Sequence, residues 1–301
     1  MRVLLATDGS NDANTATEWL KGLPLPANTT VLILTVAALP SPPTDDVMMK
    51  DLRDTILQDA HRVSGETRRL LESRWPEAEA RVTEGDPREE IIKAAEEWGA
   101  DLVVVGARGL GAIKGFLLGS VSHAVARHAP CPVLVVKGRP QPLRSAVLAV
   151  DGSDDSLHAV RFFAALEPGG EVKVHLEHVI EPVRFPSSAP GFIRARLKAA
   201  LAELRQERTA RAKAMLELCA AELGGTARPV ELLLAEGLAG EKIVQAADEN
   251  GVDLVVVGAH GLGRMKRLLL GSVSEKVLSS ARCPVLITKR PAGRRSDPAR
   301  G

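Results

Sequence analysis

Short apolar runs alternate with longer segments of helical periodicity along the whole chain. The runs are rich in β-branched residues, and Leu102–Val105 is apolar at every position, which is typical of a strand covered on both faces. Strands that alternate with helices predict βαβ units and a parallel sheet. Strands are expected near Arg2–Thr7, Thr30–Val36, Glu79–Thr83, Asp101–Val105, Pro132–Lys137, Ser145–Val150, Glu171–Val179, Arg228–Leu234, Asp253–Val257 and Pro284–Thr288.

Between the second and third strands of each half, apolar residues recur at helical spacing. We interpret both stripes as core-facing positions rather than as a surface that binds a cofactor. The stripe of the first half contains Met48, Leu52, Ile56, Ala60 and Val63, and the longer one of the second half contains Ile193, Leu197, Leu201, Leu204, Met215 and Leu218.

The chain is a tandem duplication. Thr7–Ser10 returns as Val150–Ser153, at an offset of 143 residues, and from Gly85 against Gly237 onward the offset is 152. The second copy therefore carries nine extra residues, and the proline-rich run 181–190 is the expected place for part of them. The length of 301 residues suits two domains, which we expect at 1–138 and 145–290, with a linker at 139–144 and a disordered tail at 291–301.

Each copy carries the same glycine motif after its fourth expected strand. In the first copy Gly106-x-x-Gly109 is followed after nine residues by Gly119-Ser120, and Gly258-x-x-Gly261 is followed in the same way by Gly271-Ser272. Glycine lets a backbone approach an anion closely, and the N–H groups at a helix start point toward it. The repeated spacing therefore indicates two phosphate-binding sites.

Further polar groups are expected at the same edge of each sheet, because ligands of open parallel sheets bind at the carboxyl ends of the strands. Asp8 and Asp151 end the first strand of each copy, and a carboxylate suits the hydroxyl groups of a ribose. Val36 and Val179 end the second strands. Ser120 and Ser272 are placed to cap the next helix or to donate a hydroxyl to the ligand. Two residues on, Ser122 and Ser274 would add another hydroxyl in that first turn.

This set of residues resembles the ATP-binding branch of the universal stress protein family, over residues 1–138 and 145–290. The resemblance implies two tandem, Rossmann-like (HUP-type) α/β sandwich domains, each with a five-stranded parallel sheet in the order 3-2-1-4-5. It also implies ATP as the ligand, with Mg²⁺ as its companion ion. The expected binding residues are Asp8, Val36, Gly106, Arg108, Gly109, Gly119, Ser120, Val121 and Ser122 in the first copy, and Asp151, Val179, Gly258, His260, Gly261, Gly271, Ser272, Val273 and Ser274 in the second.

In that family the aspartates lie beside the adenosine, and the backbones of Val36 and Val179 read the adenine edge. Domains usually dimerise through their fifth strand. The resemblance therefore implies an internal pseudo-dimer that pairs Pro132–Lys137 with Pro284–Thr288. Association of two chains into a homodimer is left open.

Composition narrows the classes of partner. A net charge of +1 gives no electrostatic reason to bind nucleic acid or acidic lipid, and an aromatic content of 3% argues against a base-stacking surface. The N-terminal run reaches Asp8 too early for a signal peptide, and the chain contains no apolar stretch long enough to span a bilayer. We therefore expect a cytoplasmic protein. Cys131, Cys219 and Cys283 lack metal-site spacing and are expected to be buried thiols.

The two copies differ in basic residues near the glycine motif. Arg108 in the first copy corresponds to His260 in the second, and the nine-residue spacer holds Lys114 in one copy but Arg264, Lys266 and Arg267 in the other. If these side chains lean over the site, the second copy would bind polyphosphate more tightly. The alternative is that they are solvated surface charges.

Other nucleotide motifs are absent from the sequence. The chain has no Gly-x4-Gly-Lys-Ser/Thr string, and Lys114 stands where a dinucleotide fingerprint would need its third glycine. Three functions remain: an ATP-binding regulatory stress protein with slow hydrolysis at most, an ATPase or adenylyl-transferring enzyme, and a nucleotide-free scaffold. The motif offers donors but no general base, so we predict no catalytic residue and favour regulatory binding.

Overall fold

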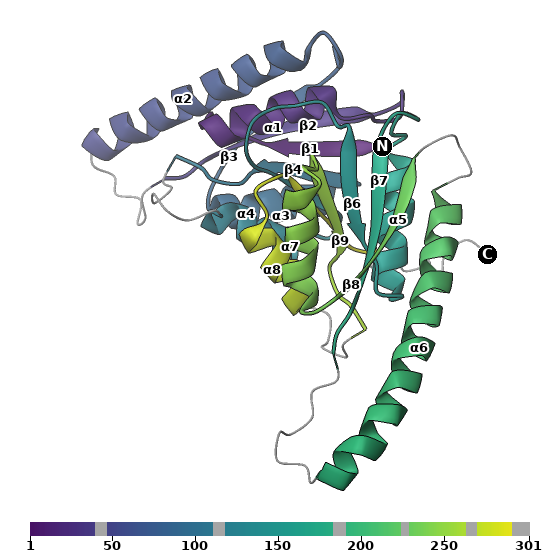
Figure 1. The fold of residues 1–301 in the computed structure, drawn as a ribbon. Helices are drawn as coiled ribbons and strands as arrows, with labels where there is room; N and C mark the ends of the chain where they lie inside the picture. Colours follow the sequence, from purple (N-terminus) through teal and green to yellow (C-terminus); the bar gives the residue numbers. More distant parts are fainter. Residues whose placement is uncertain (40–46, 111–117, 183–190, 224–228, 263–269, 291–301) are drawn as a thin grey trace, which may run out of the picture.

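The two halves of the chain share one continuous sheet. The computed structural model describes residues 1–39, 47–110, 118–182, 191–223, 229–262 and 270–290. Strands in the described residues form a 10-stranded sheet in the order β3-β2-β1-β4-β5-β10-β9-β6-β7-β8, and helices lie on both of its faces (Figure 1). The strand order 3-2-1-4-5 of each half and the α/β class are as predicted.

The elements alternate as the hydrophobic pattern predicts. Those of the first half are β1 (Arg2–Ala6), α1 (Asn11–Gly22), β2 (Thr30–Ala37), α2 (Val47–Leu71), β3 (Glu79–Glu84), α3 (Pro87–Trp98), β4 (Leu102–Gly106), α4 (Ser120–His128) and β5 (Val133–Val136). Those of the second half are β6 (Ser145–Ala149), α5 (Asp154–Ala165), β7 (Lys173–Ile180), α6 (Gly191–Glu222), β8 (Val230–Glu236), α7 (Ala239–Glu249), β9 (Leu254–Gly258), α8 (Ser272–Ser280) and β10 (Val285–Thr288).

Each face of the sheet has its own apolar core. On one face Trp19 of α1 and Phe163 of α5 pack with the inner ends of α2 and α6. On the other face Ile91 of α3 and Val125 of α4 pack with their counterparts from α7 and α8. The central strands contribute to both cores because their successive side chains point to opposite faces.

The halves meet through β5 and β10, which pair antiparallel while all other strand pairs are parallel. Leu134 lies opposite Leu286, its own equivalent in the repeat. A pseudo-two-fold axis therefore passes between these two residues. The internal pseudo-dimer expected from the sequence is present in the structure.

Two lysines, Lys137 buried and Lys289 half-buried, join the halves beside this axis. Lys137, at the end of β5, donates to the carbonyl groups of Leu278 and Ala281 (2.9 Å to Ala281), at the end of α8. Lys289 donates in turn to the carbonyl of Ala129, at the end of α4, at 2.8 Å. Each half thus supplies a cation to the negative end of a helix in the other half.

The prediction that α2 and α6 bury their whole apolar stripes is wrong. Ala60 and Val63 are buried, but Met48 and Leu52 are 74% and 41% exposed. Both helices extend past the sheet at one end (Figure 1), so the apolar stripe of α2 continues there beyond the core. In α6, Leu218 is 69% exposed within the part of the helix that packs on the core, so it lies on the outer side of that helix. The side chains of Ile193 and Leu197 lie outside the described residues.

Candidate functional site

Two loops of the first repeat meet at the carboxyl edge of the sheet, around Asp8. One oxygen of its carboxylate accepts the N–H of Ser10 at 3.0 Å, within the loop after β1. The other oxygen accepts the N–H of Leu110 at 3.0 Å, in the loop after β4. The hydroxyl of Ser10 adds a bond to the carbonyl of Arg108 at 3.2 Å. The predicted convergence of Asp8 with the glycine loop is therefore present.

The second repeat builds the same junction around Asp151. Its carboxylate accepts the N–H of Ser153 at 2.9 Å and the N–H of Leu262 at 3.0 Å. The hydroxyl of Ser153 donates to the carbonyl of His260 at 3.4 Å. The two repeats thus reproduce a network in which an aspartate ties the loop after the first strand to the glycine loop.

The motif glycines are in close contact with the protein itself. A Cβ on Gly106 would lie 2.6 Å from the backbone of Asp12, and a Cβ on Gly109 would lie 2.5 Å from the carboxylate of Asp8. The equivalent distances for Gly258 and Gly261 are 2.8 and 2.4 Å. Packing of α1 or α5 and of the aspartate therefore requires these four glycines, in addition to any need of a bound anion.

The helices that follow the glycine loops begin without a side-chain cap. The N-cap residues of α4 and α8 are Gly119 and Gly271, and within the described residues neither helix start has a side-chain cap bond. Ser120 and Ser272 are the first helical residues and are exposed, so the prediction that they cap these helices is wrong. The first N–H groups of both helices are left available to an external acceptor.

Other helices begin with the side-chain cap bond that α4 and α8 do not show among the described residues. In α1 the hydroxyl of Ser10 accepts the N–H of Ala13, and in α5 Ser153 does the same for Ser156. Asp86 caps α3 through the N–H of Arg88. The N-cap residue of α7, Leu238, also makes no side-chain cap bond, but α7 does not follow a Gly-x-x-Gly loop.

The next serines shape the loops. Ser122 is buried, and its hydroxyl donates to the carbonyls of Ala107 and Gly119, at 2.6 and 3.0 Å. The hydroxyl of buried Ser274 donates to the carbonyl of Gly258 at 2.6 Å. The loop backbone thus takes the hydroxyl protons of these two serines, and their contact with a ligand stays a prediction.

Val121 and Val273, at the second helical position, are half-buried and pack against the apolar core. Their side chains are therefore directed to the protein interior. Only their backbone N–H groups lie in the first helical turn, where they are available to an anion.

Val36 and Val179 lie beyond the ends of the neighbouring strands. Pairing between β1 and β2 ends at Ala6 opposite Leu34, followed by a bond from the N–H of Thr7 to the carbonyl of Leu34. Since backbone groups alternate sides along a strand, the N–H and carbonyl of Val36 face the side that β1 has left. Val179 is placed in the same way relative to β6. The N–H of Val150 bonds the carbonyl of Glu177, which is two residues before Val179.

A histidine that the motif did not indicate lies next to this position in the second repeat. His178 is bonded through Nδ1 to the carbonyl of Val150 at 2.8 Å, directly before Asp151. Its equivalent, Thr35, is buried, and its hydroxyl has no hydrogen-bond partner among the described residues. The alignment of the repeats places these residues together, but only the structure shows that His178 supports the strand end.

The basic residues of the glycine loops are paired with acidic residues. Arg108 bonds Asp12 at 2.9 Å, and this bond raises the pKa of the arginine. His260 lies 3.1 Å from Asp155, which also accepts from Arg290 at 2.7 Å. Both loop residues thus hold the first turn of the helix after the first strand.

The spacer residues that motivated the predicted asymmetry are outside the described ranges. They are Lys114, Arg264, Lys266 and Arg267. Tighter polyphosphate binding by the second copy therefore stays a prediction.

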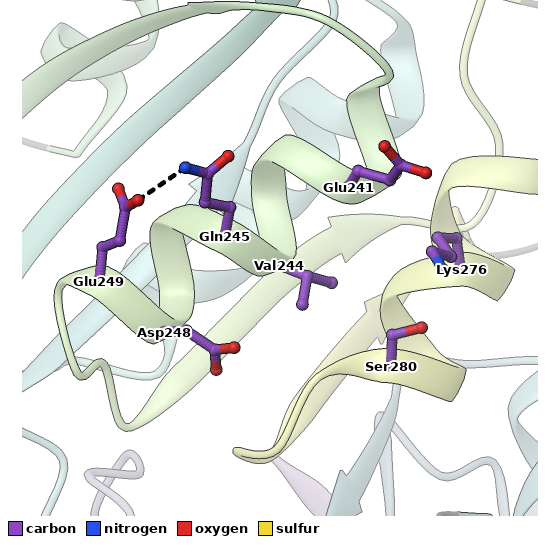
Figure 2. A pocket seen from close by; sticks show the side chains of 7 residues that line it. All are labelled: Glu241, Val244, Gln245, Asp248, Glu249, Lys276 and Ser280. Atoms are coloured by element: carbon purple, nitrogen blue, oxygen red, sulfur yellow. Dashed lines mark hydrogen bonds between the residues drawn. The ribbon is translucent and has the colours of Figure 1, made fainter.

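Two shallow grooves lie between pairs of helices. The first, of about 420 Å³, is between α7 and α8; Figure 2 shows Val244 at its floor, with Glu241 and Lys276 near one end. The second, of about 400 Å³, lies between α1 and α2 and includes Gly9, the residue after Asp8. The second groove adjoins the predicted site, whereas the first faces away along the outer helices.

The described residues add little metal or thiol chemistry. Within them, histidine, cysteine, aspartate and glutamate form no group of three that could hold a metal ion. Cys131 and Cys219 are buried as expected, while Cys283 is half-buried. Desolvation raises the pKa of the Cys131 thiol to about 12 and that of Cys283 to about 11. These thiols are therefore poor nucleophiles.

No helix in the described ranges is both long and apolar enough to cross a membrane.

The family model described as "Universal stress protein family" matches residues 1–137 and 142–289, which is nearly the whole chain. The chain belongs to the universal stress protein family. Universal stress protein Rv2005c of Mycobacterium tuberculosis is 29% identical over 304 aligned residues, covering 96% of this chain and 97% of that protein. Universal stress protein MJ0531 of Methanocaldococcus jannaschii is 32% identical over 148 residues, covering 49% of this chain and 83% of the relative.

Solved structures support the tandem fold of this universal stress protein. The crystal structure of a universal stress protein from Archaeoglobus fulgidus DSM 4304 superposes with a TM-score of 0.68, covering 97% of each chain at 23% identity. A universal stress protein solved in complex with cAMP matches 48% of this chain at 25% identity, with a TM-score of 0.36, and its ligand is a property of that protein. Both halves of the chain therefore have the fold of the family.

Proposed function

We propose that this universal stress protein binds an adenine nucleotide, ATP, at the carboxyl edge of each repeat. The observation that carries the proposal is the uncapped start of α4 and α8, placed beside an aspartate that joins both loops. Helix N-termini attract phosphate through their free N–H groups and their partial positive charge. Carboxylate oxygens accept hydrogen bonds from hydroxyl groups, which suits a ribose.

The remaining parts of a nucleotide have matching groups at the same edge. The N–H groups of Ser120 and Val121, and of Ser272 and Val273, would hold the phosphates. The backbone of Val36 or Val179 faces the side left free by the first strand and offers a donor and an acceptor to the adenine edge. Mg²⁺ would enter bound to phosphate oxygens, because it commonly keeps water and substrate phosphates as ligands.

We further propose that occupancy has a regulatory role, with slow hydrolysis at most. Catalysis of hydrolysis would need a group that positions or deprotonates water. The carboxylates of Asp8 and Asp151 each accept two backbone N–H groups, and Asp12 and Asp155 are paired with basic residues. All four carboxylates are therefore already engaged by the protein rather than by a water molecule, so binding is better supported than turnover.

Titration with ATP and analysis of the nucleotide released from the denatured protein would test this proposal. The matched variant is Ser120→Asp with Ser272→Asp, which places a carboxylate at the first position of each helix. Aspartate stabilises a helix start but repels phosphate, so the variant should fold and lose ATP binding. Wild-type protein that carries no nucleotide and does not bind added ATP would favour the nucleotide-free scaffold.

A further inference from the structure

The two proposed nucleotide sites differ one helical turn after the glycine–serine pair. His123 of α4 and Glu275 of α8 occupy equivalent positions of the repeat. Their N–H groups bond the carbonyls of the N-cap residues, Gly119 at 3.1 Å and Gly271 at 2.9 Å. Each side chain therefore belongs to the turn that would receive the phosphates.

These two side chains contact each other across the pseudo-two-fold axis. Nε2 of His123 lies 2.7 Å from a carboxylate oxygen of Glu275, and both side chains are partly exposed. Because equivalent positions meet here, two identical repeats would place histidine against histidine or glutamate against glutamate. The duplicated chain has thus acquired a pair that identical copies could not form.

The pair has an electrostatic consequence for the sites. Side chains of a helix lean toward its N-terminus, so His123 and Glu275 lie over the first turns of α4 and α8. A carboxylate in a first turn already interacts with the positive end of the helix and repels an incoming anion. An imidazole, neutral or protonated, does not repel it. The first repeat is therefore more positive than the second by at least one unit of charge at this position.

The other described charges at the two loops differ in the same direction. Arg108 offsets Asp12 in the first repeat. In the second, the single guanidinium of Arg290 pairs with two carboxylates, those of Asp154 and Asp155. The difference between His123 and Glu275 is therefore not cancelled by these ion pairs.

The positive charge of Lys276, the next residue, does not offset the carboxylate of Glu275 at the second site. The stem of Lys276 packs on α7, where a Cβ on Gly240 would lie 2.7 Å from its Cγ. Figure 2 shows Lys276 at the groove between α7 and α8. Its charge thus lies on the α7 side of the helix, whereas Glu275 lies on the α4 side.

We propose that the His123–Glu275 pair contributes an inequality between the two nucleotide sites, favouring a polyphosphate at the first repeat and weakening it at the second. This contribution is separate from the one predicted for the spacer residues and opposite to it in direction. This inference rests on the proposed function. A single charge in a first helical turn changes an anion's binding roughly twofold to fivefold. The effect should follow the phosphate charge and be absent for adenosine.

Exchange of the two residues in the full chain tests the proposal. The variant His123→Glu with Glu275→His keeps the pair but reverses its direction, and leaves the spacer residues unchanged. The ATP affinity of each site is measured in a protein whose other site is blocked. Ser272→Asp blocks the second site so that the first can be measured, and Ser120→Asp blocks the first so that the second can be measured. We expect the exchange to weaken ATP binding at the first site roughly twofold to fivefold and to strengthen it at the second by a similar factor.

Two further variants separate a local effect from a general one. Glu275→Gln alone should strengthen ATP binding at the second site, and it serves if the exchange variant fails to fold. Glu241→Gln removes a carboxylate from the first turn of α7, outside the proposed sites, and should leave both affinities unchanged. Adenosine affinity should be the same in all variants.

The outcomes distinguish this inference from the function on which it rests. Opposite shifts at the two sites support it. Equal shifts, or none, with ATP still bound would overturn the inference and keep the proposed function. Wild-type protein that binds no ATP at either site would overturn both.

Discussion

The two repeats share their backbone arrangement but differ in the side chains around it. Both tie an aspartate to the glycine loop and begin the next helix at an uncapped glycine. Around this frame, buried Leu34 of the first repeat is replaced by Glu177, and Gly138 by Arg290. The comparison teaches that the shared part of the site is made of glycines, backbone groups and the aspartate and serine side chains that tie the loops, while the side chains around it differ.

The largest loss of stability is expected from a side chain added at the motif glycines Gly106 and Gly258, which contact backbone atoms in both repeats. Gly106→Ala places a Cβ against backbone atoms of α1, which cannot rotate away, and should lower the free energy of unfolding by about 3 kcal/mol or more. Gly258→Ala should do the same to the second repeat. Denaturant unfolding followed by circular dichroism measures both losses.

Gly65→Ala is the matched control for this change, because a Cβ there meets nothing within 4 Å in the interior of α2. It should stabilise the protein by up to about 1 kcal/mol, since alanine favours helix. A Gly106→Ala protein as stable as wild type would show that α1 does not constrain the glycine loop.

The next largest effect is a pH dependence of stability that comes from Glu177, which only the second repeat has. Burial raises the pKa of Glu177 to about 7 from 4.5, with Lys242 and Glu249 of α7 as its charged neighbours. Between these values the folded protein keeps a proton that the unfolded chain has lost, so the free energy of unfolding falls as pH rises from 4.5 to 7. Glu177→Gln removes this fall and should be more stable than wild type above pH 7 by about 2 to 3 kcal/mol.

Chemical denaturation at several pH values measures this difference. Glu241→Gln, on the outer side of α7, is the control and should keep the wild-type pH dependence. If Glu177→Gln and wild type lose stability in parallel as pH rises, the glutamate is not the group responsible.

The contacts between the repeats predict a smaller effect. Lys137→Met leaves the carbonyls of Leu278 and Ala281 without their donor and should cost about 1 to 3 kcal/mol. Lys289→Met should lower the free energy of unfolding by less, because Lys289 donates to one described carbonyl across the halves, that of Ala129. Unfolding curves that show the reverse order would contradict the idea that these donors hold the halves together.

The smallest expected effect concerns the loop hydroxyls. Ser122→Ala removes bonds to two carbonyls and should lower the free energy of unfolding by about 1 to 2 kcal/mol. Ser274→Ala removes its bond to Gly258 and should cost about 1 kcal/mol. Hydrogen exchange of the glycine loops would show whether the loss is local, and unchanged exchange in both variants would argue against a loop-shaping role.

Much of this architecture could be predicted from sequence. Repeated apolar runs predicted the strands, motifs recurring at a fixed offset predicted the duplication, and the strand ends predicted the meeting of Asp8 with the glycine loop. These features depend on local patterns and on the general rule that the carboxyl ends of parallel strands share an edge.

Other features depend on contacts that a linear pattern does not contain. Met48 and Leu52 keep helical periodicity where α2 passes beyond the sheet, so the pattern predicted burial that does not occur. Ser120 has the residue type of a cap, but the N-cap position is one residue earlier, at Gly119. The pairing of His123 with Glu275 required the position of the pseudo-two-fold axis.

The covalent link between the repeats changes how the β5–β10 pairing responds to dilution. In two separate chains, the same strands would pair only above a concentration set by their dissociation constant. Here each strand finds its partner within one molecule, where a short tether provides an effective concentration on the order of millimolar. The ten-stranded sheet should therefore persist at any expression level, and its stability should be independent of protein concentration.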